Sequence, residues 1–245
     1  MYKSFLVLFC LMIFCSLHAQ EDDELVTGFH FGPKVGLTMA NQNWNGFQRR
    51  PLFDYHGVLF IESLDPYYKG SLFAQIGYHS RGSSLILNNI TQGFNFSEGV
   101  VFRNLGITLG AKKRLYIPSM SSTPYYFVGV RAEYNVANNT EEIQTRFSAT
   151  ASSLFYPFPI YVNKIVYGLS FGGGFEFAGS EYISPAIELN VSPDIGFQYM
   201  SPEIFPVLNP RTGMTTTLQE RSIRNITFEI SFVLRFKREV ILLDY

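Results

Sequence analysis

Strict alternation of polar and apolar residues is the strongest constraint on the fold of this chain. Residues 225–236 read NITFEISFVLRF, with Phe228 and Ile230 in one set and Glu229 in the other. A period of two residues predicts a β-strand whose two sets of side chains point to opposite faces. The two faces of this strand must therefore meet different surroundings.

The same alternation recurs in eight segments, separated by Gly, Pro, Asn and Ser. The segments cover about residues 27–40, 53–64, 70–85, 99–115, 123–137, 162–178, 181–192 and 223–236. After the N-terminal region there is no run of about 18 apolar residues and no clear 3.6-residue period, which argues against transmembrane helices. The pattern predicts an all-β fold, an eight-stranded antiparallel up-and-down transmembrane β-barrel.

The connections between these segments alternate in length. Long ones follow the first, third, fifth and seventh segments, and short ones such as DPYYK and YIPSMSS follow the second and fourth. Bacterial outer-membrane barrels have this asymmetry, with long loops outside and tight turns in the periplasm. We therefore expect an integral outer-membrane protein with both termini in the periplasm.

The N-terminus has the features of a secretory signal. Lys3 precedes an apolar run from Phe5 to Leu17, and Ala19 lies just before an acidic stretch. This pattern predicts a cleaved signal peptide over residues 1–19 and an outer-membrane barrel domain over 20–245, with strands at about 27–236 and a short periplasmic C-terminal tail. Cys10 and Cys15 both fall in the signal, so disulfides and thiolate metal or catalytic sites are not expected.

The composition decides which face of the strands meets lipid. Glycine and charged residues share one face, while Phe, Tyr, Ile and Leu occupy the other. Eight strands enclose too little space for so many large apolar side chains, so the apolar face is predicted to point outward into outer-membrane lipid. The second segment is ambiguous, because Val58 and Phe60 favour one register and Leu59 and Ile61 the other, which suggests a bulge or a strand partly facing a plug.

The inward face is predicted to carry a charge network. Its members are Lys34, Arg81, Lys112, Arg131, Glu133, Glu176, Glu188 and Glu229. Both signs occur in a narrow lumen, and buried charges must pair. We therefore expect an ion-paired plug that closes the barrel to solutes, in preference to a gated pore, which requires a wider barrel.

Aromatic residues collect in the last two long loops. These loops hold Phe155, Tyr156, Phe158, Phe197, Tyr199 and Phe205, together with the apolar side chain of Met200. Exposed aromatic side chains on long loops are typical of surfaces that contact other proteins. The alternative is an interfacial aromatic girdle, and the sequence leaves both interpretations open.

Catalytic, cofactor and metal sites are not expected. His30, His56 and His79 lie on different strands without a metal-ligand spacing, and the trio of Ser80, His79 and Glu133 has adjacent residues pointing to opposite faces. The net charge of -1 gives no reason to expect nucleic acid as a partner. The alternatives kept open are an outer-membrane lipid-modifying enzyme and a small-ligand-binding barrel of the lipocalin kind.

The stretches GPKVGLTMAN and GSLFAQIGYHSRGSSL resemble the PorT-like outer-membrane β-barrel family of Bacteroidetes. The resemblance covers essentially the whole mature chain and implies an eight-stranded barrel in the outer membrane. Some members of the family are accessory components of type IX protein secretion and gliding motility. The resemblance thus implies a non-enzymatic structural or accessory role in an envelope assembly, with other envelope or secretion-machine proteins as partners.

Overall fold

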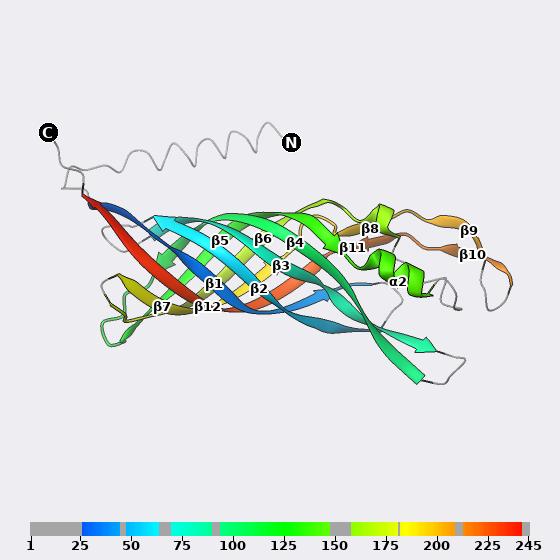
Figure 1. Ribbon diagram of the computed structural model, residues 1–245, viewed down its shortest axis with the longest axis horizontal. Helices are drawn as coiled ribbons and strands as arrows, with labels where there is room; N and C mark the ends of the chain where they lie inside the picture. Colours follow the sequence, from blue (N-terminus) through cyan, green and yellow to red (C-terminus); the bar gives the residue numbers. More distant parts are fainter. Residues whose placement is uncertain are drawn as a thin grey trace, which may run out of the picture.

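The computed structural model describes residues 26–44, 48–63, 70–89, 94–147, 158–180, 182–208 and 213–241, so the predicted signal peptide lies outside the described residues. Eight long strands close into a barrel in the order β1-β12-β7-β6-β5-β4-β3-β2, with every neighbouring pair antiparallel (Figure 1). The predicted all-β eight-stranded antiparallel barrel is confirmed.

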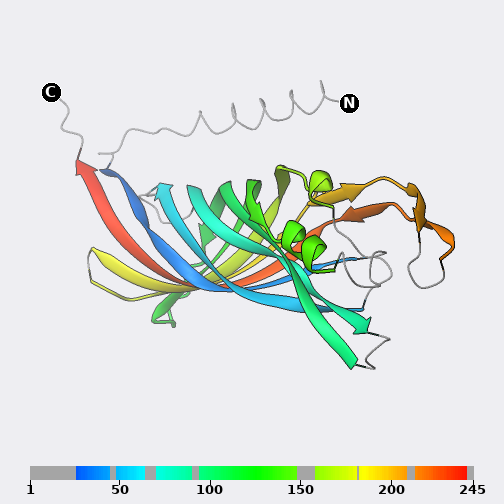
Figure 2. The same ribbon diagram turned by 45° about the vertical axis from the view of Figure 1, so that its right-hand side comes forward.

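The elements follow one another in a simple order. They are β1 (Val26–Gln42), β2 (Gln48–Ser63), β3 (Gly70–Asn89), β4 (Phe94–Arg114), β5 (Ser122–Asn138), α2 (Thr140–Phe147), the 3-10 turn η1 (Pro159–Tyr161), β6 (Ile165–Phe177), β7 (Ile183–Pro193), β8 (Tyr199–Ser201), β9 (Ile204–Leu208), β10 (Thr215–Leu218), β11 (Arg221–Ile223) and β12 (Asn225–Ile241). We call the end where β1 begins and β12 finishes the terminal end, and the opposite end the loop end (Figures 1 and 2).

The last strand is longer than the sequence pattern indicates. Residues 237–241 were expected to form a tail, but they continue β12 and pair with residues 26–30 of β1. The charged residues Lys237, Arg238 and Glu239 hide the alternation there, and pairing with β1 supplies the missing constraint. The predicted C-terminal tail is therefore wrong as far as Ile241, and residues 242–245 lie outside the described part.

The two faces of the barrel wall have opposite polarity. Outward side chains such as Leu37, Leu59 and Phe232 are 65%, 62% and 52% exposed, whereas the inward Lys34 and Glu229 are buried. This is the reverse of a water-soluble barrel, whose apolar side chains fill the interior. In the described ranges no helix is both long and apolar enough to cross a membrane.

The structure also resolves the ambiguous second segment. Val58 and Phe60 point into the lumen, while Leu59 and Ile61 face outward. The register between β2 and β3 shifts between Pro51 and His56, which marks a β-bulge. The ambiguity at residues 58–61 arises because the large apolar side chains of Val58 and Phe60 face the lumen, while the register shift lies earlier in the strand.

The loop end contains more regular structure than expected. β3 and β4 extend beyond the barrel as a long hairpin, so most of the connection predicted after the third segment is strand (Figure 1). The fifth connection contains α2, whose first turn carries Glu141 and Glu142, a favourable placement at a helix N-terminus. The seventh connection forms two small antiparallel pairs, β8 with β11 and β9 with β10. Short helices and two-stranded pairs lack enough periods to stand out in a sequence.

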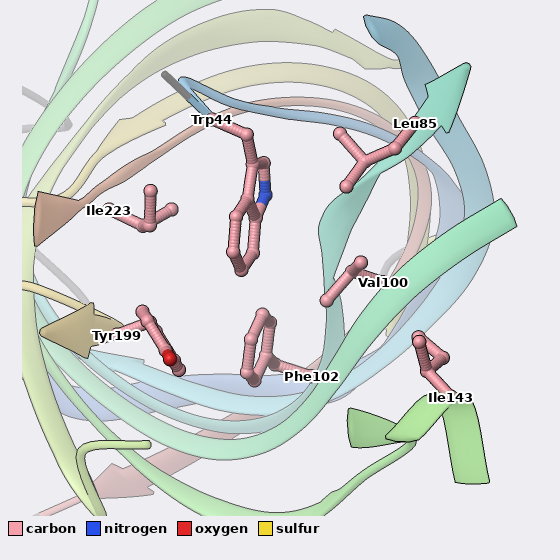
Figure 3. Close-up of a cluster of buried hydrophobic side chains, with 7 residues drawn as sticks. All are labelled: Trp44, Leu85, Val100, Phe102, Ile143, Tyr199 and Ile223. Carbon is pink, nitrogen blue, oxygen red and sulfur yellow. The ribbon is translucent and has the colours of Figure 1, made fainter. Parts of the chain in front are cut away.

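An apolar cluster packs inside the loop-end mouth of the barrel (Figure 3). We call this group the mouth cluster, and its buried members are Trp44, Leu85, Val100, Phe102, Ile143, Tyr199 and Ile223. They come from β3, β4, α2, β8, β11 and the segment after β1, so the elaborated connections close over the barrel. The rings of Trp44 and Tyr199 are in a tilted contact, with centroids 5.5 Å apart.

Glycine on the lumen face makes room for inward aromatic rings. A Cβ atom added at Gly172 would lie 2.2 Å from Phe127 Cζ and 2.4 Å from the carbonyl oxygen of Leu189. The Gly172→Ala variant should therefore lose about 1–3 kcal/mol of unfolding free energy through overpacking. Chemical unfolding of the folded barrel in detergent measures this loss.

The matched control for that variant is Gly57→Ala. A Cβ atom at Gly57 would meet no heavy atom within 4 Å, so its stability should stay within about 0.5 kcal/mol of wild type. Equal effects of the two substitutions would contradict the close packing of Phe127 against Gly172.

Candidate functional site

A layer of charged side chains fills the lumen toward the loop end. We call it the loop-side layer, and it consists of His79, Arg81, Arg131, Glu133, Asp194 and Glu229. Arg81 pairs with Glu133 and, at 3.2 Å, with Glu229 Oε1, while Arg131 bridges Glu133 and Asp194. Glu133 and Glu229 also accept hydrogen bonds from Asn104 Nδ2 at 2.8 Å and Asn190 Nδ2 at 2.9 Å. The carboxylates are therefore satisfied from several strands at once.

A second charged layer lies toward the terminal end. This terminal-side layer consists of Glu62, Lys112, Arg114, Glu176 and Arg235. Glu62 Oε2 is 2.8 Å from Lys112 Nζ, and Glu62 Oε1 pairs with Arg114. Arg114 Nε donates to Glu176 Oε2 at 3.0 Å, and Arg235 also pairs with Glu176. Three basic residues thus share two carboxylates.

Aromatic rings separate the two charged layers. Phe60, Phe73, Tyr125 and Phe127 pack together in the lumen with Ala186 and Val233. Lys34 crosses this aromatic layer: its Nζ lies 2.8 Å from Glu188 Oε1 and 5.2 Å from the centroid of the Phe60 ring. Tyr125 Oη donates to Glu188 Oε2 at 2.9 Å. The ion pair is thereby held among rings that favour a cation and exclude water.

Basic and acidic side chains in the lumen are equal in number among the described residues. Its basic members are Lys34, Arg81, Lys112, Arg114, Arg131 and Arg235, and its acidic members are Glu62, Glu133, Glu176, Glu188, Asp194 and Glu229. Each of these side chains is at most 11% exposed. Paired charges, aromatic rings and the mouth cluster follow one another along the lumen from the terminal end to the loop end. We call this whole filling the lumen plug.

The structure brings the eight residues of the predicted charge network into the lumen, divided between these layers. Lys112 and Glu176 lie in the terminal-side layer, whereas Arg81, Arg131, Glu133 and Glu229 lie in the loop-side layer. Lys34 pairs only with Glu188 among the described carboxylates. One layer spanning all eight residues does not form, because the aromatic layer lies between them.

Sequence reasoning missed several members of the network. Glu62 belongs to the strand whose register was ambiguous, and Arg114 lies at the end of a run of three basic residues. Asp194 lies just beyond β7, in what was interpreted as loop. Arg235 alternates in step with Glu229 along the last strand and so shares its inward face, but it is not among the predicted network residues. Val58, Phe60 and Glu62 are alternate residues, so the register that turns Val58 and Phe60 inward also turns Glu62 inward. This spacing is the signal that could have revealed Glu62.

The histidines lie in different environments. His56 and His79 face each other on β2 and β3 with stacked rings 5.8 Å apart. His56 Nδ1 is 3.0 Å from Thr38 Oγ1 and His56 Nε2 is 2.9 Å from Ser231 Oγ, while His79 Nδ1 is 2.9 Å from Glu229 Oε1. Across the described ranges, no three His, Cys, Asp or Glu side chains are grouped to hold a metal ion.

The aromatic residues of the loop-end connections do not form one surface. Phe155 and Tyr156 lie outside the described residues. Tyr199 is buried in the mouth cluster, so it cannot serve as a contact surface, which corrects the prediction for this residue, and Phe158 is partly buried against the cluster. Burial also raises the pKa of Tyr199 above its usual value. The prediction is wrong for Tyr199 because a folded loop buries some of its aromatic residues.

The remaining described members of this set are Phe197, which is half-buried, and Met200 and Phe205, which are exposed. The Phe197 ring lies under the guanidinium of Arg224, with 4.1 Å between the Arg224 Cζ atom and the ring centroid. Met200 and Phe205 are 49% and 67% exposed. Met200 and Phe205 are therefore the exposed members of the predicted aromatic surface within the described residues.

A closed barrel with an apolar exterior and a paired, polar lumen is the arrangement of integral outer-membrane β-barrels. The protein is therefore an integral bacterial outer-membrane β-barrel of eight strands. No protein-family model and no curated protein is found to match its sequence.

Solved outer-membrane proteins have similar chain traces. Neisserial surface protein A is 9% identical, with a TM-score of 0.48 over 86% of this chain and 97% of that chain. OprG from Pseudomonas aeruginosa is 11% identical, with a TM-score of 0.46 over 86% of this chain and 96% of that chain. The attachment invasion locus protein Ail of Yersinia pestis is 11% identical, with a TM-score of 0.38 over 85% of this chain and 99% of that chain.

Proposed function

We propose that this protein is a non-enzymatic component of an envelope assembly, anchored by its barrel and contacting other proteins outside the membrane. The lumen plug supports this role indirectly, because a filled lumen offers no path for solutes. The two ends of the barrel are then the parts that can contact partner proteins. The loop end is the elaborated one, and we assign it to the cell exterior and the terminal end to the periplasm.

The observation that carries the proposal is an apolar hairpin that extends beyond the loop end. β9 and β10 pair only with each other among the described strands and project away from the barrel (Figures 1 and 2). Phe205, Leu208 and Met214 on this β9–β10 hairpin are 67%, 64% and 71% exposed. Apolar side chains clustered away from lipid favour a protein contact, since burial on a partner removes them from water.

Type IX protein secretion is the specific assembly we propose. The PorT-like stretches GPKVGLTMAN and GSLFAQIGYHSRGSSL support this choice, and both contribute to barrel strands, β1 and β3. Barrels of that family include accessory components of secretion and gliding. The partners would then be other outer-membrane subunits of the secretion machine.

Co-purification from detergent-solubilised outer membranes tests the proposal. Tagged wild type is expected to recover secretion-machine subunits, and the double variant Phe205→Ser/Leu208→Ser is expected to lose most of them. The control Thr215→Ser changes an exposed polar residue of the same hairpin and should recover the wild-type set. Equal recovery by all three forms would contradict the hairpin contact, and partners other than secretion subunits would remove type IX secretion.

The lumen plug predicts that the barrel does not conduct ions. Purified protein in a planar lipid bilayer should give no discrete conductance steps, whereas an open porin inserted under the same conditions should give them. The physical reason is that paired charges and rings leave no continuous water column. Reproducible steps from the wild-type protein would contradict a closed lumen and favour a transport role.

An outer-membrane lipid-modifying enzyme is the alternative from a different functional class. The Ser231 to His56 contact of 2.9 Å is the pairing that an activated serine needs, but both residues are buried in mid-lumen. His79 meets Glu229 instead of the neighbouring Ser80. Unchanged membrane lipid profiles in a Ser231→Ala strain would support the non-enzymatic role, and an altered profile would favour the enzyme.

A further inference from the structure

Arg235 has an unused edge on its guanidinium group. The side chain is 3% exposed; Nη1 pairs with Glu176, while Nε and Nη2 have no hydrogen-bond partner in the described part of the chain. Nη2 approaches Glu62 Oε2 only to 3.5 Å. The Nε–H and Nη2–H groups of arginine point in parallel and bind the two oxygens of one carboxylate or phosphate. A buried pair of donors is costly unless an acceptor meets them.

The surroundings of this edge carry an excess of one positive charge. Lys112, Arg114 and Arg235 share only Glu62 and Glu176 within the terminal-side layer. The other charges of the lumen lie beyond the aromatic layer or, like Lys34, are paired with Glu188. One added negative charge would balance the terminal-side layer, whereas two would be repelled by its glutamates.

A second group with an unused hydrogen-bonding atom lies beside Arg235. His30 is on the lumen face of β1, and its Nδ1 atom is buried without a hydrogen-bond partner among the described residues. The register pairs His30 with Lys237, two residues along β12 from Arg235, so the two side chains are diagonal neighbours on one face. Both therefore point toward the same part of the lumen.

The terminal end is the end of the lumen that lies nearer to this position. His30 is only half-buried, and the Glu176 side chain keeps 11% exposure. The strands of this end are not covered by the additional elements, which all lie at the loop end (Figure 2). Arg235 Nε and Nη2 are themselves buried, so an anion entering from this end must displace neighbouring side chains, but not the mouth cluster at the other end.

We propose that Arg235 and His30 form a binding site for a single carboxylate group at the terminal-end mouth of the lumen. Arg235 donates two parallel hydrogen bonds to the carboxylate, and His30 supplies the third contact through Nδ1. A carboxylate suits the site better than phosphate because its single charge matches the excess of one. The site lies at the opposite end from the β9–β10 hairpin and does not depend on the proposed assembly role.

The carboxylate can come from two sources. It can belong to a small molecule or peptide in solution, or to the acidic residues 21–24 of this chain, which precede β1 in the sequence and lie outside the described residues. The chemistry at Arg235 is the same in both cases. The experiment must therefore separate the two sources.

Acetate is the probe for the site, titrated at constant ionic strength against chloride and inorganic phosphate. The full protein, purified from membranes in detergent with 15N-labelled arginine, is expected to show one Nε–H resonance that shifts saturably with millimolar acetate and much less with phosphate. The unfolding midpoint of wild type should also rise with acetate concentration, a measurement that needs no variant. Arg235→Lys keeps the charge but loses the parallel donors, and should weaken acetate binding about tenfold or more.

Two controls make the outcome decisive. Arg103→Lys changes an arginine exposed on the outside of β4 and should bind acetate as wild type does. A variant with residues 21–24 changed to Gln and Asn distinguishes the sources. Binding by wild type indicates a ligand from solution, and binding only after this change indicates the chain's own acidic residues. Failure of both forms to bind, or equal binding by Arg235→Lys, would overturn the site.

Discussion

Glu62→Ala is expected to lower the free energy of unfolding by roughly 3–5 kcal/mol, the range found when one partner of a buried ion pair is removed. The Glu62 side chain has no exposed surface and meets Lys112, Arg114 and Arg235. Its loss would leave three buried cations with only Glu176 as an acceptor in that layer. Chemical unfolding followed by the fluorescence of Trp44, the single tryptophan, would measure the change.

The size of this effect depends on burial, and a surface control shows why. Glu203 is exposed at the loop end, so Glu203→Ala should change stability by no more than about 0.5 kcal/mol. Adding Lys112→Met to Glu62→Ala should recover part of the loss, because it removes one of the stranded charges. If Glu62→Ala were as mild as Glu203→Ala, the terminal-side layer would contribute little to the closed barrel.

Ile230→Arg should destabilise the barrel by about 2–4 kcal/mol in lipid vesicles, as an arginine facing the middle of a bilayer does. Ile230 lies in the centre of the outward series of β12, between Leu37 of β1 and Leu189 of β7. All three side chains are about half exposed or more, which in this barrel means contact with acyl chains. Equilibrium unfolding from vesicles, with the same protein in detergent for comparison, would measure the loss.

The matched control for Ile230→Arg is Phe205→Arg. Phe205 is also exposed, but it lies on the β9–β10 hairpin beyond the barrel, where a charge meets water. This control should be nearly neutral. A neutral effect of both substitutions would mean that the apolar belt faces water, which is the expectation for a soluble ligand-binding barrel.

The periodicity of the sequence determined the strands and their outward faces. The alternation through Phe228, Ile230 and Phe232 requires a strand with one apolar side, whatever its neighbours are. The number of such segments and the limited interior of an eight-stranded barrel then decide that this side faces lipid. These conclusions depend on local pattern and on volume, and both can be read from a single chain.

The partners inside the lumen were decided only by the tertiary structure. Glu62 pairs with Lys112 and Arg114 because strand register brings β2 and β4 to the same level, and a shift of one residue in β2 would turn Glu62 toward lipid. The ambiguous alternation at Val58 and Leu59 left that register open.

Tertiary contacts also decided which loop side chains are buried and which are exposed. Tyr199, Trp44 and Phe205 are all aromatic residues of connecting segments, and their type does not distinguish them. Tyr199 and Trp44 are nevertheless buried in the mouth cluster, whereas Phe205 is exposed. The difference arises because residues far apart in the chain must meet before a side chain has anything to pack against. Local periodicity thus determined the wall of this barrel, while long-range contacts decided the lumen plug, the mouth cluster and the unused edge of Arg235.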